Sequence, residues 1–112
     1  MKMLRVYEEY VAVLRAMAPL VRRIARFDVA LATQLRRAGA SVAQNLAEGH
    51  GSRGGNKRLR YENAFGSLRE VWASLECAEA LEYIEHQNDV MNQLDRVAAG
   101  LWPLTRSSSL TT

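Results

Sequence analysis

The sequence predicts an all-α fold, an antiparallel up-down-up-down four-helix bundle. Apolar residues recur at helical spacing along almost all of the 112 residues, and no stretch alternates as a half-buried strand would. Only two prolines occur, Pro19 and Pro103, and four of the seven glycines gather within 49–55. Four helices of roughly 15–25 residues with short connections are typical of such a bundle. A chain of this length supports one domain, expected at 1–104 and followed by a frayed Ser/Thr-rich tail at 105–112.

The first helix is expected at about 4–26 and has two apolar stripes. Two stripes on one helix indicate burial on more than one side, as in a subunit interface. Pro19 should kink or split this helix, because proline removes a backbone hydrogen bond and crowds the preceding turn. The second helix is expected at 28–47. Asp28 caps its start, and Gly49 stops it in a left-handed conformation.

The glycine-rich segment 49–57 is expected to be a basic loop. Helical periodicity then returns and predicts a third helix at about 58–82. The fourth helix should begin with Asn88 or Asp89 as its cap and end near Leu104, close to a proline.

Cysteine content and hydropathy indicate the cellular compartment. Cys77 is the one cysteine, so an intrachain disulfide is excluded, and we expect it to be a small buried side chain. No apolar run approaches the roughly 20 residues of a membrane span, and the N-terminal residues lack the apolar core of a secretory signal. We therefore expect a cytoplasmic protein without a membrane partner.

Charge is unevenly divided along the chain. Residues 1–60 hold 12 basic and 4 acidic side chains, whereas residues 61–112 hold 3 and 8. Such asymmetry suggests either a charged partner or two halves that attract each other.

The basic loop is the leading candidate for an outside partner, since no acid lies between Gly49 and Tyr61. Its glycines would expose backbone N–H groups to an anion. We expect phosphate-led, sequence-tolerant binding of RNA or DNA. Base stacking is not expected, because Tyr61 is the one aromatic residue nearby. The alternative is a solvated loop whose charge compensates neighbouring glutamates. The candidate residues are Arg53, Lys57, Arg58 and Arg60.

Polar side chains flank the apolar stripes of the second and third helices at matching levels. Antiparallel partners should have nearly constant sums of residue numbers, and four pairs give 107 or 108. We expect a polar ladder that fixes the helix register, since breaking a buried ion pair costs about 3–5 kcal/mol. A solvated flank of charged residues is the alternative. Small side chains at Gly66 and Ser67 would let the helices approach closely. The pairs are Arg37 with Glu70, Ser41 with Ser67, Asn45 with Asn63, and Glu48 with Arg60.

The sequence does not favour an enzyme. His50 and His86 have no sequence reason to meet. A di-iron bundle needs Glu-x-x-His pairs on two helices, and Tyr83 stands where the glutamate before His86 would be. No phosphate-binding loop, zinc cluster or Ser–His–Asp spacing occurs. We expect no catalytic, metal-binding or cofactor-binding residues, and a small-molecule or metal site in the bundle core is the remaining alternative.

Blocks on the second and third helices resemble the small bacterial four-helix-bundle proteins encoded in intervening sequences of 23S ribosomal RNA genes. The resemblance implies a bundle that assembles as a ring-shaped homopentamer. The accessory protein of diversity-generating retroelements is a distant relative, so an accessory subunit of a reverse transcriptase or another protein is an alternative function. The matching residues are Gln34–Ala38, Ser41–Val42, Asn45–Gly49, Ala64, Gly66–Leu68, Glu70 and Leu75.

Overall fold

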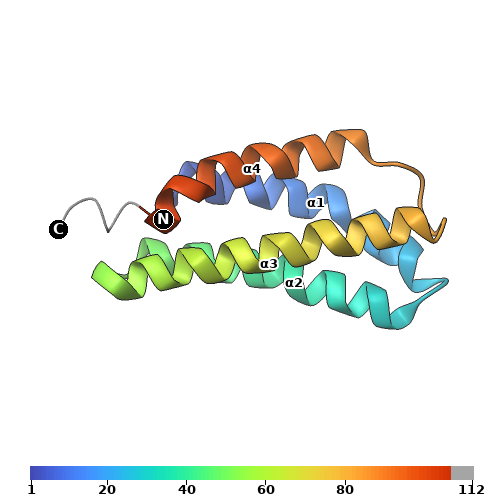
Figure 1. Ribbon diagram of the computed structural model, residues 1–112, viewed down its shortest axis with the longest axis horizontal. Helices are drawn as coiled ribbons and strands as arrows, with labels where there is room; N and C mark the ends of the chain where they lie inside the picture. Colours follow the sequence, from blue (N-terminus) through green and yellow to red (C-terminus); the bar gives the residue numbers. More distant parts are fainter. Residues whose placement is uncertain (107–112) are drawn as a thin grey trace.

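The computed structural model describes residues 1–106, which fold into four helices and no strand (Figure 1). The helices are α1 (Arg5–Ala25), α2 (Val29–His50), α3 (Gly54–Ala80) and α4 (Asn88–Arg106). Each helix packs against the one before it, and α4 returns to α1, so the four surround one core. The all-α, four-helix-bundle prediction is confirmed. Short connections send the chain back and forth along the long axis of a body measuring 48 × 24 × 22 Å.

The core is made from the inward faces of all four helices. At its centre, the Tyr10 hydroxyl donates a 2.8 Å hydrogen bond to the Gly39 carbonyl oxygen, which joins α1 to α2. Fully buried large side chains contribute most of the hydrophobic stabilisation, because each removes a large apolar area from water. They are Tyr10, Met17, Ile24, Leu35, Leu46, Tyr61, Leu75, Leu94 and Leu101.

The two apolar stripes of α1 are explained by packing within one chain, without a second subunit. Helix α1 packs against both α2 and α4. Val6 and Val13 of one stripe are buried, as are Tyr10 and Met17 of the other. The two stripes therefore face two neighbouring helices of the same subunit. Pro19 lies on the exposed side of α1 and does not split the helix, because water can satisfy the carbonyl that loses its N–H partner there.

The connection between α1 and α2 contains the predicted cap of α2. The Asp28 side chain caps α2, since its Oδ1 accepts a 2.9 Å hydrogen bond from the Leu31 backbone N–H. Its Oδ2 accepts a 3.3 Å hydrogen bond from the Tyr83 hydroxyl. The Tyr83 ring stacks on Phe27 at 5.3 Å between centroids. These contacts fasten the α3–α4 connection to the α1–α2 corner.

The prediction of a loop at 49–57 is wrong, because both flanking helices extend into it. Helix α2 continues through Gly49 to His50, and Gly49 is a buried helical residue rather than a left-handed stop. A Cβ built on Gly49 would lie 2.6 Å from Cε1 of Tyr61. The absence of a side chain at Gly49 thus lets α2 and α3 pack closely near their junction. The expected close approach at Gly66 is also wrong, since a Cβ there would meet open space.

The ends of α3 and α4 differ from the predicted ones by two residues. Helix α3 stops at Ala80, where Glu82 takes a φ of 63° and the Tyr83 N–H bonds the Ala78 carbonyl, an arrangement that ends many helices. Helix α4 continues to Arg106, and the Thr105 hydroxyl donates a 2.7 Å hydrogen bond to the Trp102 carbonyl. The rest of the expected tail, 107–112, lies outside the described residues.

Candidate nucleic-acid interface

The four basic candidates lie where α2 passes into α3. Residues 51–53 connect the helices, with Arg53 directly before α3. Lys57, Arg58 and Arg60 lie on the first turns of α3 rather than in a loop. Gly54 admits the chain into α3 with a φ of 58°, a conformation that strains other residues. A helical scaffold therefore fixes the spacing of the three helical cations.

Two of these cations are paired and two are not. Arg60 Nε lies 3.0 Å from Glu48 Oε2 on α2, and Arg58 Nε lies 3.4 Å from Glu62 Oε1. All four side chains are about half exposed, and an exposed pair adds only about 0–1 kcal/mol of stability. Arg53 and Lys57 form no ion pair within the described part of the chain. Their charge stays available to an outside anion.

The start of α3 adds backbone donors to this charge. Among the described residues no side chain caps the helix, and its first turn has no acidic residue. Space is open beside Gly54 and Gly55. The first N–H groups of a helix have no partner within it and stand at the positive end of its dipole. Arg53, Lys57 and these amides together form the basic end of the bundle.

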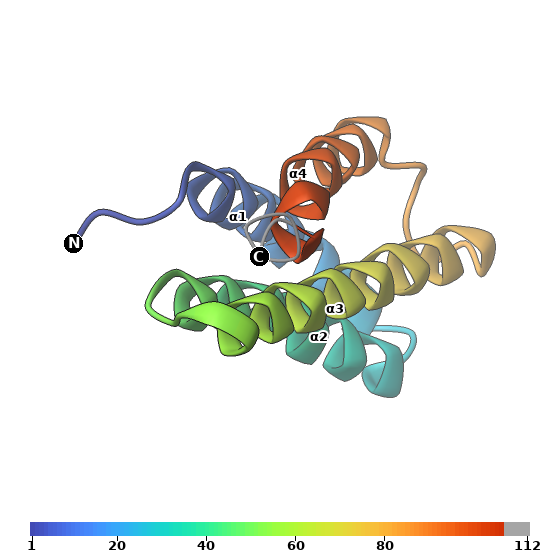
Figure 2. The same cartoon turned by 60° about the vertical axis from the view of Figure 1, so that its left-hand side comes forward.

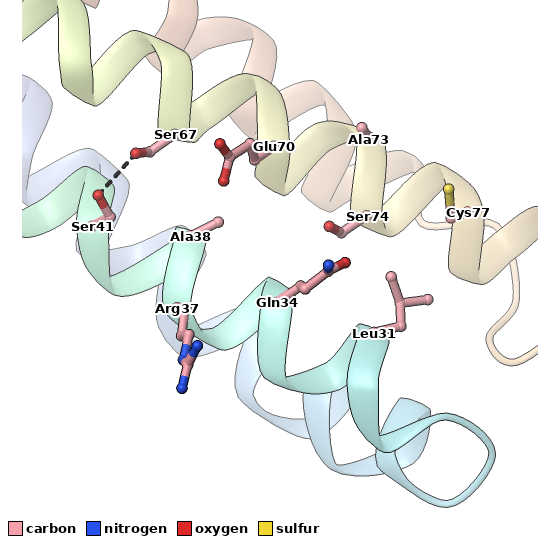
Figure 3. A pocket seen from close by; sticks show the side chains of 10 residues that line it. All are labelled: Leu31, Gln34, Arg37, Ala38, Ser41, Ser67, Glu70, Ala73, Ser74 and Cys77. Atoms are coloured by element: carbon pink, nitrogen blue, oxygen red, sulfur yellow. Dashed lines mark hydrogen bonds between the residues drawn. The ribbon is translucent and has the colours of Figure 1, made fainter.

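The polar ladder forms at two of its four levels. Ser41 Oγ and Ser67 Oγ lie 2.8 Å apart and share a hydrogen bond (Figure 3). Arg60 pairs with Glu48 two levels farther along the ladder. Both pairs have residue numbers that sum to 108, so α2 and α3 run antiparallel in the predicted register. Asn45 Nδ2 donates to the carbonyl and hydroxyl of Ser41, at 3.0 and 3.2 Å, rather than across to α3.

The other two levels do not form. Arg37 and Glu70 are both exposed, no ion pair joins them within residues 1–106, and Arg37 points away from α3 in Figure 3. Asn63 is exposed beside α4 and does not bond Asn45. Exposed charges gain little from pairing, because water already solvates them and pairing restricts two long side chains.

A groove opens between α2 and α3 beyond the serine pair. Its volume is about 670 Å³, and small or polar side chains line it, with Arg37 and Glu70 at its edges. Cys77 lies at this groove and is exposed. The prediction of a buried cysteine is therefore wrong, since α2 does not cover α3 closely at that level.

The two histidines lie at opposite ends of the bundle. His50 ends α2, whereas His86 lies in the connection between α3 and α4 (Figure 1). His86 Nδ1 is 2.7 Å from Glu79 Oε1, and this hydrogen bond, with the carboxylate charge, raises the pKa of His86. Residues 1–106 contain no group of three or more His, Cys, Asp or Glu side chains placed to hold a metal ion.

One cluster near the basic end was missed by the sequence predictions. The Phe65 and Trp102 rings meet at 5.5 Å with an angle of 62°, the edge-to-face arrangement that aromatic pairs favour. Arg69 lies over Phe65 at 4.8 Å, and Arg106 over Trp102 at 5.3 Å. The spacing of Arg58, Phe65 and Arg69 on one face of α3 was a usable signal. The partner ring on α4 was not visible before the chain folded.

The fold and this site define a small helical-bundle protein with a basic end beside an aromatic pair whose tryptophan is exposed. A family model described as 23S rRNA-intervening sequence protein matches residues 2–102. The chain therefore belongs to this family, which is not a known enzyme family, and the resemblance drawn from the sequence is confirmed. No curated protein and no solved structure matches significantly. The likeness to the retroelement accessory protein stays a prediction. No helix within the described residues is long and apolar enough to cross a bilayer.

Proposed function

We propose that this protein is a non-enzymatic interaction module that binds nucleic acid through its basic end. The observation that supports this most is the composition of 53–69, which holds five basic side chains and one acidic one. Arg53 and Lys57 of that segment have no carboxylate partner within the described residues. Arg53 is exposed and Lys57 is half-buried. Phosphate contacts need cations of this kind, without a carboxylate partner, and give sequence-tolerant affinity.

The test compares matched double variants in fluorescence anisotropy with a labelled mixed-sequence RNA at about 50 mM salt, where phosphate contacts are least weakened. Arg53→Ala with Lys57→Ala should weaken binding at least several-fold. The control is Arg22→Ala with Arg23→Ala, which removes the same charge from exposed positions near the far end of α1. Equal losses in the two variants, or no binding by the unaltered protein, would reject the basic end as the interface.

We also propose that the module is a homo-oligomer, expected from the family resemblance to be a pentamer. Large apolar side chains lie exposed around the α1–α2 corner, where Phe27 and Leu81 are each 57% exposed and Val29 is 69% exposed. Exposed apolar side chains gathered at one place are typical of association surfaces. Repetition of the basic end around an assembly would multiply phosphate contacts and so raise affinity. Light scattering should give five times 12.6 kDa, and a monomer would contradict self-association.

A further inference from the structure

An open hollow lies between α3 and α4 near the basic end. Its volume is about 370 Å³. Figure 2 shows the C-terminal part of α4 beside the first half of α3, and residues of these two segments line the hollow. The residues that line it are Glu62, Asn63, Phe65, Arg69, Trp102 and Thr105.

Of the aromatic pair in this hollow, Trp102 is exposed and Phe65 is partly buried against the core. Trp102 is 46% exposed, and its ring meets the Phe65 ring edge to face, with the Arg106 guanidinium over it at 5.3 Å. Arg69 packs over Phe65 rather than pairing with a carboxylate of the described chain. Part of the apolar surface of the Trp102 ring is therefore accessible to a ligand.

A single face of α3 joins the basic end to the hollow. Arg58, Glu62, Phe65 and Arg69 follow at i, i+4, i+7 and i+11, which places them in one stripe along the helix. The Arg58–Glu62 ion pair sets a guanidinium against the wall of the hollow. Lys57 lies about 12 Å from Phe65 along the helix axis, at 1.5 Å per residue. A strand whose phosphates contact the basic end is therefore within reach of the aromatic pair.

We propose that this hollow binds an unpaired base of single-stranded nucleic acid, stacked on Trp102, an inference that rests on the proposed nucleic-acid function. Every base has a π-face, and arginines beside aromatic rings recur where proteins bind single strands. The Asn63 amide and the Glu62 carboxylate lie at the edge of the hollow, where they supply donors and acceptors for the base edge. A duplex keeps its bases stacked inside, so the site prefers single strands.

The test measures binding of a short mixed-sequence single-stranded RNA, the matching single-stranded DNA, and the RNA duplex. Stacking on an aromatic side chain makes an affinity difference of about 5- to 150-fold per base. Trp102→Leu should show that loss for both single strands and little change for the duplex. The matched control is Trp72→Leu, which removes the other tryptophan from a position on α3 that does not line the hollow and should change nothing.

A second measurement keeps the proposal testable if Trp102→Leu folds poorly. Trp72→Phe leaves Trp102 as the only tryptophan, so its fluorescence should be quenched by the single strands and not by the duplex. Trp102→Phe should retain most of the affinity, because a phenylalanine still stacks. Loss of binding in Arg53→Ala with Lys57→Ala, together with full single-strand affinity in Trp102→Leu, would overturn this inference and leave the proposed function intact. No binding of any strand would overturn both.

Discussion

Replacing Gly49 with alanine tests the close packing that positions the basic end. An added Cβ would lie 2.6 Å from Cε1, 2.9 Å from Cδ1 and 3.1 Å from Cζ of Tyr61. That ring is only 2% exposed and lies inside the core, so it cannot swing aside into solvent. Relief of the clash requires α2 and α3 to separate.

The expected magnitude follows from two opposing effects. Alanine is favoured over glycine inside a helix by about 0.8–1.0 kcal/mol. Overpacking a filled site costs about 1–3 kcal/mol, and a rigid ring places Gly49→Ala near the upper end. The variant should therefore lose about 1–2 kcal/mol of unfolding free energy, the difference between these two effects.

Gly66→Ala is the matched control for this change. Gly66 lies inside α3, and a Cβ there meets nothing within 4 Å. This variant should gain about 0.5–1 kcal/mol, because only the helix preference changes. Urea unfolding followed by circular dichroism measures both. Equal stabilities for the Gly49 and Gly66 variants would show that α2 and α3 do not meet closely at Tyr61.

Three further predictions concern two buried hydroxyls and a histidine. Tyr10→Phe should lower the unfolding free energy by about 1 kcal/mol, since it removes the hydrogen bond to Gly39. Tyr61→Phe should be neutral or stabilising in the same urea assay, because the buried Tyr61 hydroxyl has no hydrogen-bond partner among residues 1–106; a large loss would contradict this. The raised pKa of His86, caused by Glu79, means that its charged form stabilises the fold below about pH 6.5 and that this contribution disappears as pH rises through the raised pKa. His86→Gln should thus lower the melting temperature at about pH 6 but not at about pH 9, and a pH-independent difference would count against this ion pair.

Local sequence patterns predicted the four helices and two of the four paired levels between α2 and α3. Helical periodicity identified the four helices, and the Asp28 cap formed where a short acidic side chain precedes an apolar run. Constant residue-number sums identified the Ser41–Ser67 and Glu48–Arg60 contacts. These features depend on residues that are close in sequence or on two neighbouring antiparallel helices.

Features that depend on the exact separation of helices were not predictable in the same way. Glycine is typical of the end of a helix, yet Gly49 lies inside α2, where its missing side chain leaves room for the Tyr61 ring of α3. Arg37 and Glu70 match in charge, but water competes for both because they are exposed. Trp102 acquires its surroundings only when α4 folds back on α3.

The salt dependence of RNA affinity tests the central claim most directly. For a single strand, log affinity falls with log salt by about 0.7 per phosphate contact. Arg53→Ala with Lys57→Ala should reduce that slope by about 1.4, the value for two lost contacts, whereas Arg22→Ala with Arg23→Ala should leave it unchanged. A slope that is the same in both variants and the unaltered protein would contradict phosphate binding at the basic end.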